Sequence, residues 1–225
     1  MITLGDGMAG ATSVAGAGGL SPIEPCQHGQ VLQDELLWIG DSWVESPDTQ
    51  RWYIRDRERE LGNLGASEDY ESRAAAAASM KAVAKQYADR EADPSRPKLK
   101  VLLMDGATWD PLDAQTRGTS IDDAATAAIA DFRQFLADVA TDGTVEHIVY
   151  FLVPPLPPIP KVEDMQPDLE AACHESEVPC HFLYLKEAWV GHPEFTQMAL
   201  QASPAGGTKI GEEVWKIMQA ECVAQ

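Results

Sequence analysis

The sequence contains no uninterrupted apolar run of the roughly 20 residues that a membrane-spanning helix needs. It is also poor in basic residues: 17 Lys and Arg stand against 36 Asp and Glu, which gives a formal net charge of −19. Such a surface repels phosphate backbones and anionic lipid headgroups. We therefore expect neither a nucleic-acid partner nor a membrane partner, and the sequence says nothing of oligomeric state.

The first residues lack the basic segment and the leucine-rich segment of a secretory signal peptide. They are rich in Gly, Ala and Ser, so we interpret residues 1–33 as a flexible leader and N-terminal segment. The remaining length suits one ordinary domain, and an apolar content of 44% suits a globular core. No internal repeat is visible, and we predict a single domain over 34–225.

No pair of cysteines has the C-x-x-C spacing of a zinc site, and we expect no metal and no cofactor. Cys173 and Cys180 bracket a short polar segment, while Cys26 and Cys222 lie near the two chain ends, which often meet on a domain surface. This arrangement predicts the disulfides Cys173–Cys180 and Cys26–Cys222, and an extracytoplasmic protein, periplasmic or secreted. The alternative is four buried thiols in a cytosolic protein.

Short apolar runs alternate with helical segments along the chain. The apolar runs have the character of buried parallel strands and cover 36–40, 100–104, 147–153 and 181–185. The helical segments are an alanine-rich stretch at 71–92, a stretch from a Ser120 cap to Gly143, and a final stretch at 203–221. This alternation predicts an α/β fold, a three-layer α/β/α sandwich with a parallel sheet.

The first predicted strand stops abruptly at Gly-Asp-Ser-Trp, which places Ser42 at its carboxyl end. Ligands of open parallel sheets collect at this edge, so Asp41, Ser42 and Trp43 become candidate site residues. Asp105 and Asp110 follow the second predicted strand and are expected at the same edge. A lone Gly-Asp-Ser has a second interpretation, in which the serine only caps the next helix.

The order of motifs resembles the GDSL/SGNH hydrolase superfamily over about residues 34 to 222. The first block of that family matches "IGDSW", and the resemblance implies Ser42 as nucleophile. The second block matches "NLGAS", which implies a backbone oxyanion donor at Gly65. The third block matches "DGATWD", and the last matches "MALQASPAGG" at the start of the final helix.

Three positions depart from the family pattern. Trp109 stands where the third block has the oxyanion-binding asparagine, and Met198 and Gln201 stand where the last block has its Asp and His. A serine hydroxyl is a poor nucleophile without a base, and an amide cannot act as one at neutral pH. The nearest histidine in sequence is His192, which we weigh both as a replacement base and as a surface residue.

We therefore predict a hydrolase with an SGNH-like fold and a remodelled site, acting on small esters or acylated carbohydrates. We expect the Ser42 hydroxyl to face an open cleft lined by Gly65, Trp109 and Gln201. One alternative is a carboxylate-based, glycosidase-like hydrolase that uses Asp41, Asp105 and Asp110. A second is a non-catalytic carbohydrate-binding relative, whose tryptophans stack on a sugar ring.

Overall fold

A computed structural model describes residues 31–197 and 200–224 of the chain. Its centre is a parallel sheet of five strands in the order β2-β1-β3-β4-β5. These strands are β1 (Leu36–Ile39), β2 (Glu71–Ser72), β3 (Val101–Met104), β4 (His147–Leu152) and β5 (Cys180–Tyr184). Four of them fall on the predicted apolar runs. β2 was missed because its two residues, Glu and Ser, form no apolar run.

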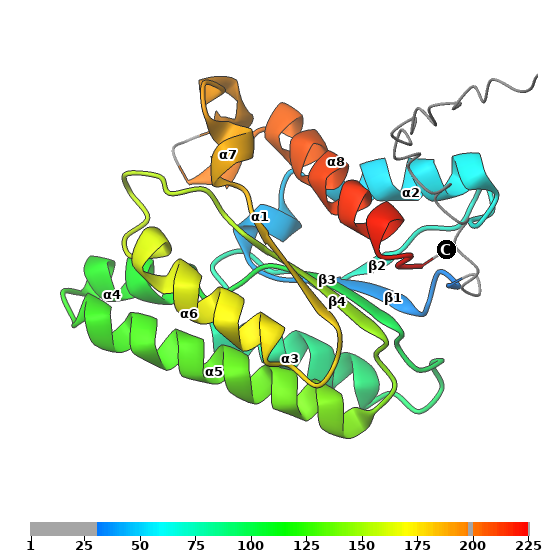
Figure 1. Ribbon diagram of the computed structural model, residues 1–225, viewed down its shortest axis with the longest axis horizontal. Helices are drawn as coiled ribbons and strands as arrows, with labels where there is room; N and C mark the ends of the chain where they lie inside the picture. The colour runs from blue at the N-terminus through cyan, green and yellow to red at the C-terminus, as the bar shows by residue number, and fades with distance from the viewer. Residues whose placement is uncertain (1–30, 198–199, 225) are drawn as a thin grey trace, which may run out of the picture.

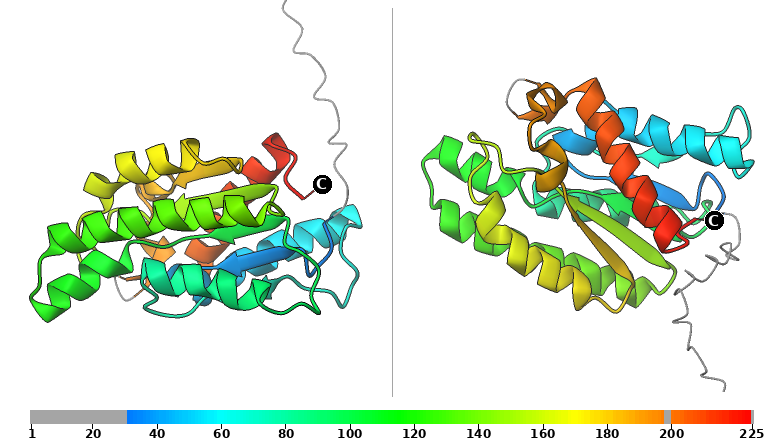
Figure 2. Two further views of the ribbon diagram at one scale, coloured as in Figure 1. Left: turned by 90° about the horizontal axis from the view of Figure 1, so that it is seen from below. Right: turned by 45° about the horizontal axis from the view of Figure 1, so that its top comes forward.

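Helices cover both faces of the sheet, so the predicted three-layer sandwich is confirmed (Figure 1). One face carries α2 (Thr49–Leu61) and α8 (Pro204–Ala220), which pack against each other. The other face carries α3 (Met80–Glu91), α5 (Ile121–Asp142) and α6 (Val162–His174), and the view from below in Figure 2 shows α5 in front of the sheet. The shorter elements are α1 (Ser42–Glu45), α4 (Trp109–Arg117), α7 (Lys186–Trp189), the 3-10 turn η1 (Pro193–Phe195), and the ribbon of β6 (Thr196–Gln197) with β7 (Gln201–Ala202).

The alanine-rich stretch is shorter as a helix than its composition predicts. Residues 71–79 are not helical, because the chain there runs beside β1: the amides of Arg73 and Ala75 donate to the carbonyls of Trp38 and Gly40. The helix α3 begins only after Ser79, whose side chain accepts from the Ala82 amide. Pairing with the sheet therefore overrides local helix propensity. By contrast, the cap at Ser120 and the left-handed Gly143 bound α5 as predicted.

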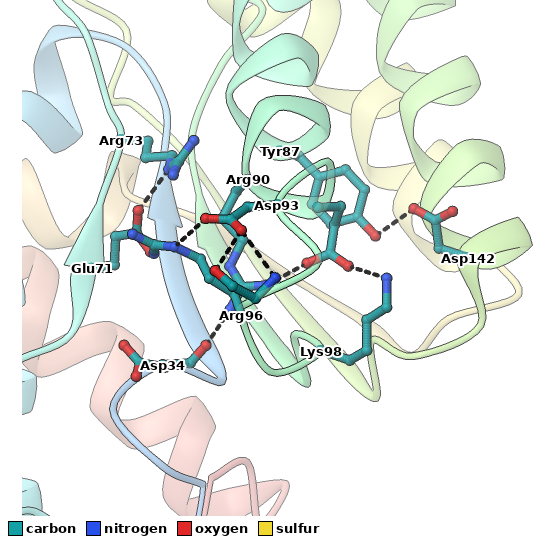
Figure 3. Close-up of polar contacts among 11 residues, drawn as sticks. Asp34, Glu71, Arg73, Tyr87, Arg90, Asp93, Arg96, Lys98 and Asp142 are labelled. Atoms are coloured by element: carbon teal, nitrogen blue, oxygen red, sulfur yellow. Dashed lines mark hydrogen bonds and ion pairs between the residues drawn. The ribbon is translucent and has the colours of Figure 1, made fainter.

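The amino ends of the strands are held by a network of ion pairs (Figure 3). Arg90 is 1% exposed, and its guanidinium donates to Glu91 at 2.8 Å and to the Asp34 carbonyl at 2.5 Å. Lys98 adds a second contact to Glu91 at 3.0 Å. Near the Arg90–Glu91 pair, the Glu71 carboxylate forms ion pairs with Arg73 and Arg96. Each buried charge at this edge thus faces a charge of opposite sign.

The disulfide Cys173–Cys180 is confirmed, with a Cα–Cα distance of 5.2 Å. Cys222 is also disulfide-bonded, and its predicted partner Cys26 lies outside the described residues. The predicted leader at 1–33 lies almost entirely outside them as well. Within the described parts of the chain, no helix is long and apolar enough to span a bilayer.

Candidate active site

Ser42 lies at the carboxyl end of β1, at the first position of the short helix α1. Asp41 caps this helix, and its Oδ1 accepts from the Trp43 amide at 3.0 Å. The turn depends on Gly40, which has a φ of 152°, and a Cβ there would lie 1.9 Å from Oδ1 of Asp105. Only a glycine therefore allows the chain to pass Asp105 and present Ser42 at this edge.

Gln86 of α3 fixes the same turn from the other side. Its amide oxygen accepts from the Gly40 N–H at 2.8 Å, and its amide nitrogen donates to the Gly40 carbonyl at 2.9 Å. Both backbone groups of Gly40 are thus satisfied by one side chain. The sequence offered no signal for this role, since Gln86 lies on a predicted helix far from any motif.

A small hollow surrounds Ser42, which is 7% exposed. Its empty volume, which includes space open to solvent, is about 220 Å³, and the part deep enough to hold water is small. That is room for about one water molecule. The lining residues are Asp41, Ser42, Trp43, Thr108, Trp109, Leu112, Ile159 and Leu200. The expected open cleft is therefore only a small, partly open hollow, and of its three expected lining residues Trp109 alone lines it.

Gly65 does not reach this hollow. It precedes β2, and because β2 runs parallel to β1, a residue before the strand lies toward the opposite edge from Ser42. Its exposed amide donates to Oε2 of Glu68 at 2.6 Å, so this N–H already has an acceptor. The segment that continues from β2 to the edge beside Gly40 is instead the alanine run after Arg73.

Thr108 is a further candidate site residue, which the alignment of the sequence motifs did not identify. It is 3% exposed and lines the hollow, and its hydroxyl donates to Oδ2 of Asp41 at 3.4 Å. Trp109, the next residue, is the first of α4 and also lines the hollow. Aligning the final Asp of the third block on Asp110 selected Trp109 as the residue at the asparagine position. In the fold, both Thr108 and Trp109 line the hollow at Ser42.

Asp110 holds two helices together rather than lining the hollow. Its Oδ2 accepts from the amide of Met80, the first residue of α3, at 2.9 Å. Burial is the main cause that raises the pKa of its carboxyl. The same edge thus carries three aspartates with different neighbours.

Asp41 and Asp105 form a buried pair of like charge. They are 2% and 1% exposed, and Oδ1 of Asp105 accepts from the Asp41 amide at 2.7 Å. The two carboxyl groups are close enough for each to shift the pKa of the other. Burial raises the pKa of both groups, and the Asp41 charge raises that of Asp105 further, well above its ordinary value.

The segment assigned to the last block forms a short ribbon followed by a helix. β6 and β7 form an antiparallel ribbon in which Gln201 pairs with Gln197, and Ser203 caps α8. Gln201 is half-buried and is not among the residues that line the hollow, while Met198 lies outside the described residues. Among the described residues, no side chain hydrogen-bonds the Ser42 hydroxyl.

His192 lies on the surface beyond a row of aromatic rings. Trp43 contacts Trp189 at 5.9 Å between ring centroids, Trp189 contacts Phe195 at 5.4 Å, and Phe195 stacks on His192 at 4.6 Å. The Nδ1 of His192 is 2.8 Å from Oε1 of Glu194. This is an acid–imidazole pair, but it lines a separate groove with Pro193 and Val190 and does not line the Ser42 hollow.

No group of three or more His, Cys, Asp or Glu side chains is placed to hold a metal ion within the described residues. Neither a family model nor a curated protein matches this sequence. Solved structures do match it. They include the acetyl xylan esterase AlAXEase, at 9% identity and a TM-score of 0.64 over 81% of this chain and 98% of that one.

The chain has the SGNH-hydrolase fold. TesA matches at 13% identity and a TM-score of 0.59, over 82% of this chain and 98% of TesA. A member of the lipolytic G-D-S-L family from Veillonella parvula matches at 10% identity and a TM-score of 0.60, over 81% of this chain and 96% of that one. At these identities the SGNH likeness concerns the fold, and the site must be argued from its own side chains.

Proposed function

We propose that this chain is an SGNH-fold esterase with a remodelled site, which removes small acyl groups such as acetyl from carbohydrate hydroxyls. The observation that carries the proposal is the placement of Ser42 at the carboxyl end of β1, fixed on both sides and open only to a small hollow. The acetyl xylan esterases among its structural neighbours support the substrate class. The net charge of −19 disfavours anionic substrates.

In the proposed reaction the Ser42 oxygen adds to the ester carbonyl and the alcohol leaves, and water then hydrolyses the acyl-serine. Neither Met198 nor Gln201 can take the serine proton, so water must accept it and turnover is slow. Thr108 lines the hollow, and its hydroxyl replaces the missing asparagine donor only by turning away from Oδ2 of Asp41. The hollow has room for about one water molecule, so an acetyl group enters only if lining side chains move.

The test is covalent labelling of Ser42 by a fluorophosphonate, together with hydrolysis of p-nitrophenyl acetate and butyrate. We expect slow labelling, acetate preferred to butyrate, and loss of both signals in Ser42→Ala. Hydrolysis that persists in purified Ser42→Ala would exclude Ser42 as the nucleophile. A protein that binds acetylated xylo-oligosaccharide but is neither labelled nor active would instead be the non-catalytic relative.

The glycosidase-like alternative fits the geometry less well. Paired carboxyl groups in glycosidases stand about 5–10 Å apart, with the sugar between them. Asp41 and Asp105 are buried and lie side by side, which leaves no such space. Trp43, expected to stack on a sugar ring, is only 2% exposed. Turnover of aryl glycosides would restore this alternative.

We also propose an extracytoplasmic location, because structural disulfides persist in oxidising compartments. The support is Cys173–Cys180 and the disulfide-bonded state of Cys222. Intact-mass analysis after alkylation without reductant, on protein taken from its native cells, should find no modified thiol. Four modified thiols would place the protein in a reducing compartment.

A further inference from the structure

The two oxygens of Asp105 have different surroundings. Oδ1 accepts from the Asp41 amide at 2.7 Å, whereas Oδ2 is buried and has no hydrogen-bond partner in the described residues. An ionised carboxylate with an unpartnered, buried oxygen is costly, because desolvation is not repaid by hydrogen bonds. A proton on Oδ2 removes this cost, since the hydroxyl so formed can donate to the neighbouring Asp41 carboxylate.

Among the described residues, the main causes that shift the pKa values of this pair include no cation. Burial acts on both carboxyls, and the charged or titratable groups that interact with them are Tyr150 of β4 and Asp110 of α4. Tyr150 donates its hydroxyl to the Gly106 carbonyl at 3.0 Å, so it does not donate to Asp105. Two carboxylates this close cannot both be ionised without strong repulsion.

We propose that Asp105 carries a proton in the folded protein and is a positioning residue for Ser42. One oxygen receives the Asp41 amide and the other donates to the Asp41 carboxylate, so a single side chain sets both the backbone and the side chain of the residue before the nucleophile. The role concerns the same site as the proposed esterase and rests on Ser42 being its reacting group.

The proposal predicts how the site responds to pH. Because the pair shares one proton, raising the pH until that proton leaves puts two negative charges side by side in a buried place. The contact between Asp105 and Asp41 then becomes repulsive, and the turn at Gly40 loosens. Ser42 reactivity should therefore fall at alkaline pH, beyond any effect of the reagent's own hydrolysis.

The test compares Asp105→Asn with Asp105→Ala. Asparagine reproduces the protonated acid, since its oxygen can accept from the Asp41 amide and its NH₂ can donate to the Asp41 carboxylate. We expect fluorophosphonate labelling of Ser42 in Asp105→Asn within about 3-fold of wild type, without the alkaline decline. In Asp105→Ala labelling should slow by about 10²-fold, the effect of a misplaced reacting group. Glu58→Gln, which neutralises a buried carboxyl under α2, is the matched control and should label as wild type does.

Labelling as slow in Asp105→Asn as in Asp105→Ala would show that the charge of Asp105 is needed, and would overturn the proposal. Carboxyl ¹³C NMR of aspartate-labelled protein gives a readout that does not depend on activity. One resonance of the protonated type should be present at pH 7 and absent in Asp105→Asn. If wild-type Ser42 is never labelled, the esterase function fails, and this resonance alone decides the protonation of Asp105. Its absence at pH 7 would overturn the proposal.

Discussion

Buried charges at the two edges of the sheet have different neighbours: opposite charges at the amino edge and like charges at the carboxyl edge. At the amino edge, buried Arg90 donates to Glu91 and to a carbonyl, Lys98 also contacts Glu91, and Arg73 and Arg96 pair with Glu71 nearby (Figure 3). At the carboxyl edge, Asp41 and Asp105 lie side by side, and neither forms an ion pair with a cation in the part of the chain that the structure describes. Opposite charges at the first edge stabilise the fold, whereas like charges at the second shift pKa values. Such shifts cluster at functional sites, which singles out the edge that carries Ser42.

The largest effect should come from breaking the pairing at the amino edge. Arg90→Leu removes the guanidinium while Glu91, whose side chain is 8% exposed, stays buried with one lysine. We expect a loss of about 3–5 kcal/mol in the free energy of unfolding, measured by denaturant titration. Lys85→Met, which breaks the exposed pair with Asp89, is the control and should cost less than about 0.5 kcal/mol. Equal effects of the two changes would contradict the contrast between the edges.

The next effect concerns the carboxyl edge, where a base can be supplied. Met198→Asp combined with Gln201→His restores the acid and the imidazole of the last block. We expect hydrolysis of p-nitrophenyl acetate to rise by about 10²-fold, the usual contribution of a positioned base. Either change alone should do little, because the imidazole needs its orienting carboxylate. A folded double variant without any gain would mean that β7 does not bring position 201 to Ser42.

A lone buried carboxyl gives a reference for the pair. Glu58 is fully buried, and among the described residues it forms no ion pair. Its Oε2 accepts a hydrogen bond from the Asn63 side chain at 2.7 Å. Burial raises its pKa from 4.5 to about 7. The folded state therefore binds the proton more tightly than the unfolded state, and stability from this group is present below pH 4.5 and lost as pH rises through about 7.

Glu58→Gln should remove this loss. We expect the variant to be more stable than wild type by about 2 kcal/mol at pH 8, after allowance for solvent screening, and to differ little near pH 4. Thermal or denaturant unfolding across this pH range is the measurement. A constant difference between the two proteins at all pH values would mean that Glu58 titrates as it does in the unfolded chain.

The smallest effect should come from the amide that holds Gly40. Gln86→Leu leaves the Gly40 N–H without its partner, while the Gly40 carbonyl keeps only the bond from the Ala75 amide. We expect a loss of about 1–2 kcal/mol in unfolding free energy, as for two partly buried hydrogen bonds. Fluorophosphonate labelling of Ser42 should slow as well, since the turn is less constrained. Unchanged labelling would assign the positioning of Ser42 to Asp105 alone.

Motif spacing and tertiary placement agree at the first block and diverge at the second. The apolar run 36–40 predicts a buried strand, and Ser42 indeed follows it directly. Gly65 was assigned as the oxyanion donor because it is the glycine of "NLGAS". However, it lies before β2 in the chain, and the carboxyl edge follows that strand. A two-residue strand has no hydrophobic pattern, so the sequence could not place the second block relative to the edge. Thr108 was missed because the third block was aligned on Asp110, which selected Trp109 alone, although both residues line the hollow.

The glycines of the last block are required by the packing of α8. A Cβ at Gly206 would lie 2.0 Å from the Phe195 carbonyl oxygen, and one at Gly207 would lie 2.2 Å from the Thr49 hydroxyl. The close approach of α8 to the chain requires these residues whether or not a base precedes them. The motif "SPAGG" therefore predicts the start of a helix and says little about catalysis.

By itself the sequence determined the layers of this protein, the strand before Ser42, the caps of α5 and the disulfide Cys173–Cys180, because periodicity, capping and cysteine spacing are local patterns. Only the tertiary structure decided that the hollow beside Ser42 is small, that Thr108 lines it, and that Asp41 and Asp105 meet. These depend on how β1, β3 and their loops lie against one another. Residues 64 positions apart share a hydrogen bond that no local pattern encodes.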